Sequence, residues 1–60
     1  MKDYKVETFD LFGKDKQKYF RTREGAEAYA ESLQVKRDTD IFILQRENGF
    51  WYCINRIRRN

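Results

Sequence analysis

Hydrophobic and polar side chains in the first third of the chain follow the pattern of two short strands. The segment YKVETFDLF (4–12) predicts one strand, with apolar side chains at Val6, Phe9 and Leu11. QKYFRT (17–22) predicts its partner. The intervening GKDK (13–16) has the glycine and the charges of a turn in water. These residues therefore predict a first hairpin.

A helical period replaces this pattern after Thr22. Apolar side chains recur at a spacing of i, i+3, i+4 and i+7, which forms a single stripe on a helix: Ala26, Tyr29, Ala30 and Leu33. Thr22 lies just before this run, where an N-cap residue belongs. The spacing predicts a helix over 23–34 that lies close against the sheet.

Two longer apolar runs then predict a second hairpin. IFILQRE (41–47) and FWYCINRIR (50–58) are separated by Asn48-Gly49, which suits a type I′ turn because both central residues of that turn need a positive φ. We therefore expect one α+β domain over 1–60, a ββαββ chain with a four-stranded antiparallel sheet and one helix packed on one face. Its core is expected to include Val6, Leu11, Phe20, the helix stripe and one face of the second hairpin.

The last strand is apolar on both faces, whereas a half-buried strand usually alternates. A regular register about the turn pairs Leu44 with Cys53 and Ile43 with Ile54. One hairpin face then carries Phe42, Leu44, Trp51, Cys53 and Ile57, and the other carries Ile41, Ile43, Phe50, Tyr52 and Ile54. One helix can cover only one of these faces, so the other is expected to meet a partner. The expected partner or dimer interface is the second set: Ile41, Ile43, Phe50, Tyr52 and Ile54.

Composition favours self-association and argues against an enzyme. A chain of 60 residues forms a marginal core, and with one cysteine and no histidine it cannot close an internal disulfide or assemble a tetrahedral zinc site. No glycine-rich phosphate loop or paired carboxylates occur in the sequence. We expect no catalytic residue, no cofactor and no metal, and we expect Cys53 to be a small buried hydrophobic residue.

Neither a membrane span nor an export signal is expected. No apolar run approaches the roughly 18 residues that a transmembrane helix needs. The start of the chain, MKDYKVETFD, lacks the apolar segment of a signal peptide. The expected location is the cytoplasm.

Aromatic and arginine residues near the end of the chain suggest nucleic-acid binding as an alternative. Aromatic rings on a sheet can stack on single-stranded bases while guanidinium groups neutralise phosphates. The residues that would make these contacts are Trp51, Tyr52, Arg56, Arg58 and Arg59. The same rings also fit the core or a protein interface of a small domain, and the net charge of +3 is mild for a nucleic-acid-binding protein.

The segment YFRTREGAEAYAESL (19–33) resembles the strand-to-helix step in the arm-site DNA-binding domains of phage-type tyrosine integrases. In that family a strand ending in Phe-x-Thr leads to a helix with alanine and an aromatic residue on its inner face. The family has three strands before its helix, whereas we expect two before and two after, and the similarity covers about a quarter of the chain. The resemblance therefore transfers no DNA-contacting residue to this chain.

The main prediction is a small, non-catalytic, cytoplasmic protein-interaction module that forms a homodimer. Compact, charged, single-domain chains of this size are common among phage and mobile-element accessory proteins, some of which act on host proteins. That class is the one we expect here. The alternative is a nucleic-acid-binding module that uses the last strand.

Overall fold

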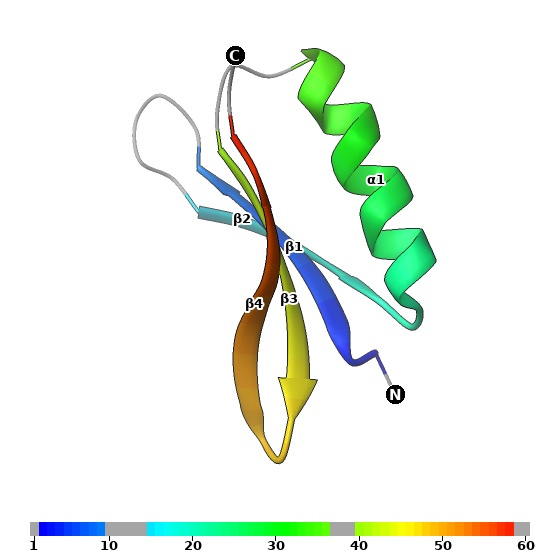
Figure 1. The fold of residues 1–60 in the computed structure, drawn as a ribbon, viewed down its shortest axis with the longest axis vertical. Helices are drawn as coiled ribbons and strands as arrows, with labels where there is room; N and C mark the ends of the chain where they lie inside the picture. The colour runs from blue at the N-terminus through cyan, green and yellow to red at the C-terminus, as the bar shows by residue number, and fades with distance from the viewer. Residues whose placement is uncertain (1, 10–14, 37–39, 59–60) are drawn as a thin grey trace.

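The computed structural model describes residues 2–9, 15–36 and 40–58. Its elements are β1 (Tyr4–Phe9), β2 (Asp15–Phe20), α1 (Arg23–Lys36), β3 (Ile41–Glu47) and β4 (Phe50–Ile57). The strands form one antiparallel sheet in the order β2-β1-β3-β4, and α1 lies on one side of it (Figure 1). The predicted α+β fold with its ββαββ order is confirmed. Two residues with a predicted role lie outside the described residues: Leu11 and Arg59.

Helix α1 begins at the predicted position. The backbone N–H of Gly25 donates a hydrogen bond to Thr22 Oγ1 at 3.1 Å, which makes Thr22 the N-cap. A Cβ on Gly25 would lie 3.1 Å from the same oxygen, so the glycine leaves room for the cap. On the exposed side of the helix, Arg23 Nε donates to Glu27 Oε1 at 2.9 Å, and this hydrogen bond raises the pKa of Arg23.

The core lies between α1 and the sheet. Its enclosed apolar side chains are those of Val6, Ala26, Ala30, Ile41 and Ile43. Two of them are alanines on the helix stripe, which allow the helix backbone to approach the sheet closely. Larger half-buried side chains surround this centre: Tyr4, Phe20, Tyr29, Leu33, Ile54 and Ile57. The core residues predicted on β1, β2 and the helix are confirmed wherever the structure describes them.

The turn between β3 and β4 has the predicted geometry. Asn48 and Gly49 have φ values of 53° and 81°, as a type I′ turn requires. Nothing lies within 4 Å of the position that a Cβ would take on Gly49. The glycine is therefore needed for its backbone conformation and not for space.

Beyond this turn the register departs from the predicted one at a β-bulge. Ile43 pairs with Asn55 and not with Ile54, because the bulge inserts one extra residue into β4. The shift turns Arg56 to the side away from the helix and returns Ile57 to the core side. In a regular strand, two side chains on the same face are an even number of residues apart. Ile54 and Ile57 are three residues apart and both pack against the core, so their spacing in the sequence indicates the bulge.

Candidate interaction surface

One face of the sheet points away from α1, and no described element covers it (Figure 1). We call it the open face. The strand register places the following residues on it: Lys5, Glu7 and Phe9 of β1; Asp15, Gln17 and Tyr19 of β2; Phe42, Leu44 and Arg46 of β3; and Trp51, Cys53 and Arg56 of β4. The open face is therefore a mixture of aromatic, aliphatic and charged side chains.

A lysine lies near the middle of the open face, beneath two aromatic rings. Lys5 is only 8% exposed, and its Nζ lies 4.6 Å from the ring centroid of Trp51 and 6.0 Å from that of Tyr19. These rings come from the two outer strands, yet their centroids are 6.0 Å apart. They therefore meet above the central strands. The Lys5 ammonium also donates a hydrogen bond to Gln17 Oε1 at 3.3 Å, and these contacts replace the water that the charge has lost.

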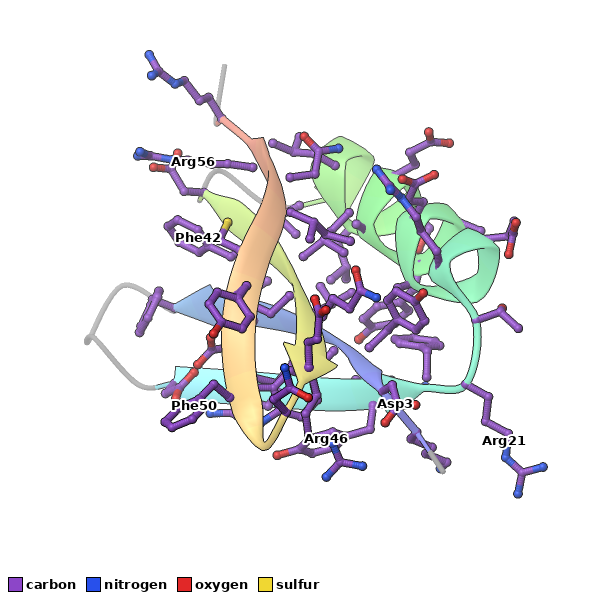
Figure 2. The ribbon with its side chains drawn as sticks, turned by 60° about the horizontal axis from the view of Figure 1, so that its bottom comes forward. Asp3, Arg21, Phe42, Arg46, Phe50 and Arg56 are labelled. Carbon is purple, nitrogen blue, oxygen red and sulfur yellow. The ribbon has the colours of Figure 1, made fainter. Side chains whose placement is uncertain are left out.

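A second cation lies against Trp51. The guanidinium carbon of Arg46 is 5.7 Å from the indole centroid, and its Nη2 pairs with Asp3 Oδ1 at 3.0 Å. The backbone N–H of Arg46 also donates to the carbonyl of Asp3 at 2.7 Å. Both residues lie at the end of the sheet where the Asn48-Gly49 turn joins β3 and β4 (Figure 2). The start of the chain thus holds Arg46 in place beside the indole.

Another aromatic group occupies the opposite end of the open face. The rings of Phe9 and Phe42 meet edge to face, with centroids 6.1 Å apart and planes at 80°. The Arg56 guanidinium carbon lies 5.2 Å from the Phe42 centroid, and Figure 2 shows the two side chains next to each other. Arg56 also forms an ion pair with Asp40. This end therefore repeats the combination of ring, arginine and carboxylate.

The charges on the open face nearly cancel. Its three cations each lie over an aromatic ring: Lys5, Arg46 and Arg56. Four carboxylates belong to this face or pair with its arginines: Asp3, Glu7, Asp15 and Asp40. The positive charge of the chain, +3 in total, is therefore not concentrated on this face.

The residues predicted to form a partner interface are divided between the core and the start of β4, next to the Asn48-Gly49 turn. Ile41 and Ile43 have no exposed surface and Ile54 is half-buried, since the helix covers the side of the sheet on which they lie. Their placement corrects the expectation that they form part of an exposed face. Phe50 and Tyr52 are exposed, at 67% and 54%. The register places both on the helix side of the sheet, but Phe50 follows the Asn48-Gly49 turn and lies at a distance from the helix itself (Figure 2).

The residues predicted to contact nucleic acid do not gather on one face. Trp51 and Tyr52 are neighbours on β4, so their side chains point to opposite sides of the sheet. Arg56 shares the open face with Trp51, but it pairs with Asp40. Arg58 is exposed beyond the end of β4.

Lys5 is central to the open face, although it was not predicted to belong to a site. Alternation along YKVETF does place Lys5 on the face opposite Val6, which is a signal that could have been used. The contact between Tyr19 and Trp51 has no such signal. It depends on the strand order β2-β1-β3-β4, which the two hairpins alone do not determine.

Cys53 is exposed, which corrects the expectation of a buried thiol. It lies on an outer strand and on the face away from the helix, so nothing in the described structure encloses it. Its Sγ lies 3.3 Å from the carbonyl of Asn55. Among the described residues, no group of three or more histidine, cysteine, aspartate or glutamate side chains could hold a metal ion.

The structure was also compared with known proteins. No protein-family model, curated protein or solved structure matches the chain significantly. In the described part of the chain no helix has the length and apolar character to cross a membrane.

Proposed function

We propose that this protein is a non-catalytic protein-binding module that recognises its partner through the open face. The observation that carries the proposal is the row of rings across this face, with Phe9 and Tyr19 exposed at 40% and 45%. The arginines beside these rings are already paired with carboxylates of the same chain. Aromatic and arginine side chains within a polar rim are typical of the centres of protein interfaces.

The same observations support a protein partner over a nucleic acid. Phosphate binding needs lysines and arginines whose charge is available, because affinity comes from releasing counterions at each contact. Arg46 and Arg56 are paired with Asp3 and Asp40, and Lys5 is covered by rings. Trp51 has two cations close to its ring, which leaves less of that ring for stacking on a base.

The biological setting remains part of the proposal. Small size and a charged composition support a cytoplasmic accessory protein of a phage or mobile element that binds a host protein. Such a role needs only a stable surface, and the absence of histidine makes a binding role simpler to support than a catalytic one.

Site-specific photo-crosslinking tests this function. A benzophenone amino acid replaces Phe9 on the open face, and in a control protein it replaces Ser32, which is exposed on the helix. Both proteins are irradiated in an extract of the native host. We expect the probe at position 9 to give discrete adducts that protease removes and nuclease does not, and the probe at position 32 to give few or none.

Two results would contradict the proposal. Adducts that nuclease removes would favour the nucleic-acid alternative. Equal labelling from positions 9 and 32 would mean that the open face is not selective. A direct titration with mixed-sequence single-stranded RNA and DNA at low salt complements this experiment, and we expect no binding by the native protein.

A further inference from the structure

The two outer strands of the sheet differ in how suitable they are for pairing with another strand. Strands β2 and β4 are the edges, and each edge strand has backbone N–H and C=O groups that no neighbour in the sheet can bind. Strand β2, DKQKYF, carries lysines at 16 and 18 and an aspartate at 15. Strand β4 has no charged residue from Phe50 to Ile54. The β2 edge is thus protected by charge, whereas this part of the β4 edge is not.

The turn geometry determines which residues of β4 direct their backbone groups outward. A β-turn joins the carbonyl of its first residue to the N–H of its fourth, which makes Glu47 and Phe50 a hydrogen-bonded pair. Such pairs alternate along an antiparallel ladder. Phe50 and Tyr52 therefore bond to β3 through their backbones. Trp51 and Cys53 direct their N–H and C=O groups to the outer edge.

We infer that a second copy of the chain pairs with β4 in antiparallel orientation, about a two-fold axis at Tyr52. In this register Trp51 of each copy lies opposite Cys53 of the other, and the outward groups of these residues form four hydrogen bonds. Tyr52 lies opposite its own counterpart in a pair without backbone hydrogen bonds, where Cα atoms are about 4.5 Å apart. A register centred one residue earlier would place the bond-forming partner of Cys53 at Gly49, inside the turn.

The exposed side chains of β4 support a second copy as the occupant. Two-fold pairing brings Phe50 against Ile54 of the other copy and the two Tyr52 rings together, all on the helix side of the sheet. Phe50 and Tyr52 are the most exposed large apolar residues among those described, and this contact would cover them. No charge is placed opposite a like charge between residues 50 and 54. A two-fold pairing of β2 centred on residue 16, 17 or 18 would instead put lysines opposite lysines.

This pairing also limits the assembly to two copies. A two-fold contact uses the same edge of both chains and therefore closes, and the remaining outer edges are the two charged β2 strands. The result is a continuous eight-stranded sheet with both helices on one side and both open faces on the other. The inference concerns the strand edge and does not depend on the proposed function of the open face.

Sedimentation equilibrium over a series of concentrations tests the dimer. We expect the native chain to reach twice the monomer mass and no more. Tyr52→Lys places two ammonium groups opposite each other, so its dissociation constant is expected to rise at least about tenfold. Ser32→Lys adds the same charge on the exposed helix and is expected to match the native chain. A native chain that stays monomeric, that forms larger polymers, or that dimerises equally well with Tyr52→Lys would overturn the inference.

Cysteine crosslinking tests the register of the pairing between the two β4 strands, and it does not depend on the dissociation constant of the dimer. In a Cys53→Ser background, Tyr52→Cys brings two thiols to the two-fold axis at a separation that a disulfide can bridge, and Lys18→Cys places one on the exposed β2 edge as a control. Mild oxidation is expected to give a covalent dimer of Tyr52→Cys much faster than of Lys18→Cys. Equal rates, or a faster reaction at position 18, would show that β4 does not pair about Tyr52.

Discussion

Lys5 lies on the open face, which no described helix covers, and its side chain has little access to water. The ammonium lies over Trp51 and donates a hydrogen bond to Gln17, while Tyr19 covers it from the other outer strand. A lysine and an indole therefore stabilise each other, because the ring replaces solvent around the charge and the lysine stem covers the ring.

Removal of Trp51 is expected to destabilise the monomer. Trp51→Ala removes the ring from Lys5, Arg46 and Tyr19 together, and we expect a loss of about 2 to 3 kcal/mol in the free energy of unfolding. Phe50→Ala is the matched control, because Phe50 is 67% exposed and is expected to cost less than about 1 kcal/mol. Urea unfolding followed by circular dichroism, at concentrations where the chain is monomeric, measures both. Equal losses would contradict a structural role for the indole.

Adjacent residues of β3 provide a test of which hairpin face lies under the helix. Ile43 is fully enclosed and Leu44 is half-buried on the open face. Ile43→Ala is expected to cost about 2 to 5 kcal/mol, since it leaves a cavity in the core, and Leu44→Ala is expected to cost clearly less. Urea unfolding followed by circular dichroism measures the loss in the free energy of unfolding for both variants. A larger loss at Leu44 would mean that the helix covers the other face.

At the scale of the elements, local signals predicted the helix and the second turn, and tertiary packing decided what they could not. Helix α1 is determined by residues close in sequence, namely the Thr22 cap and the apolar stripe from Ala26 to Leu33. The turn between β3 and β4 is determined by Asn48-Gly49 without help from other residues. The face of the second hairpin under α1 was not predictable, because both faces are apolar. The choice depends on the strand order, which brings Val6 of β1 beside Ile43 of β3.

The two glycines described in α1 and in the β3–β4 turn are expected to respond differently to alanine. Gly49 has a φ of 81°, so Gly49→Ala should cost about 1 to 2 kcal/mol through backbone strain alone. Gly25→Ala gains about 1 kcal/mol of helix propensity, but its Cβ would crowd the Thr22 hydroxyl at 3.1 Å. We therefore expect a smaller loss, or none, at position 25. Thermal unfolding of the two variants ranks them, and a greater loss at position 25 would contradict this reasoning.

At the scale of the whole molecule, the ion pairs determine what kind of partner the open face suits. The sequence shows a chain with a net charge of +3 and arginines near its end, which is compatible with nucleic-acid binding. It does not show that Asp3 and Asp40 lie beside two of the arginines. Asp3 is separated from Arg46 by 43 positions in the sequence, and Asp40 from Arg56 by 16 positions. Some residues of the open face could thus be predicted from the alternation of side chains along the strands. The ion pairs that balance its charge could not be predicted from the sequence.

Removal of these two carboxylates is expected to change that balance. Asp3→Asn combined with Asp40→Asn removes the Asp3 and Asp40 carboxylates that pair with Arg46 and Arg56. We expect the double variant to bind single-stranded RNA weakly at low salt, with a slope of log affinity against log salt of about −1.4 for two phosphate contacts. Fluorescence anisotropy of a labelled oligonucleotide measures this. Tight binding by the native chain would contradict the proposed preference for protein, and no binding by the variant would show that the ion pairs do not restrain the arginines.

The bulge at Ile54 has a consequence for how the length of this chain can vary. Cys53 already pairs with Leu44, and Asn55 already pairs with Ile43, so a chain without Ile54 would keep every later residue of β4 on its present side of the sheet. An insertion or deletion between Phe50 and Cys53 would reverse all of them. In relatives of this protein we expect single-residue alignment gaps in β4 to fall at position 54, where a residue can be added or removed without moving the later side chains of β4 to the other face of the sheet.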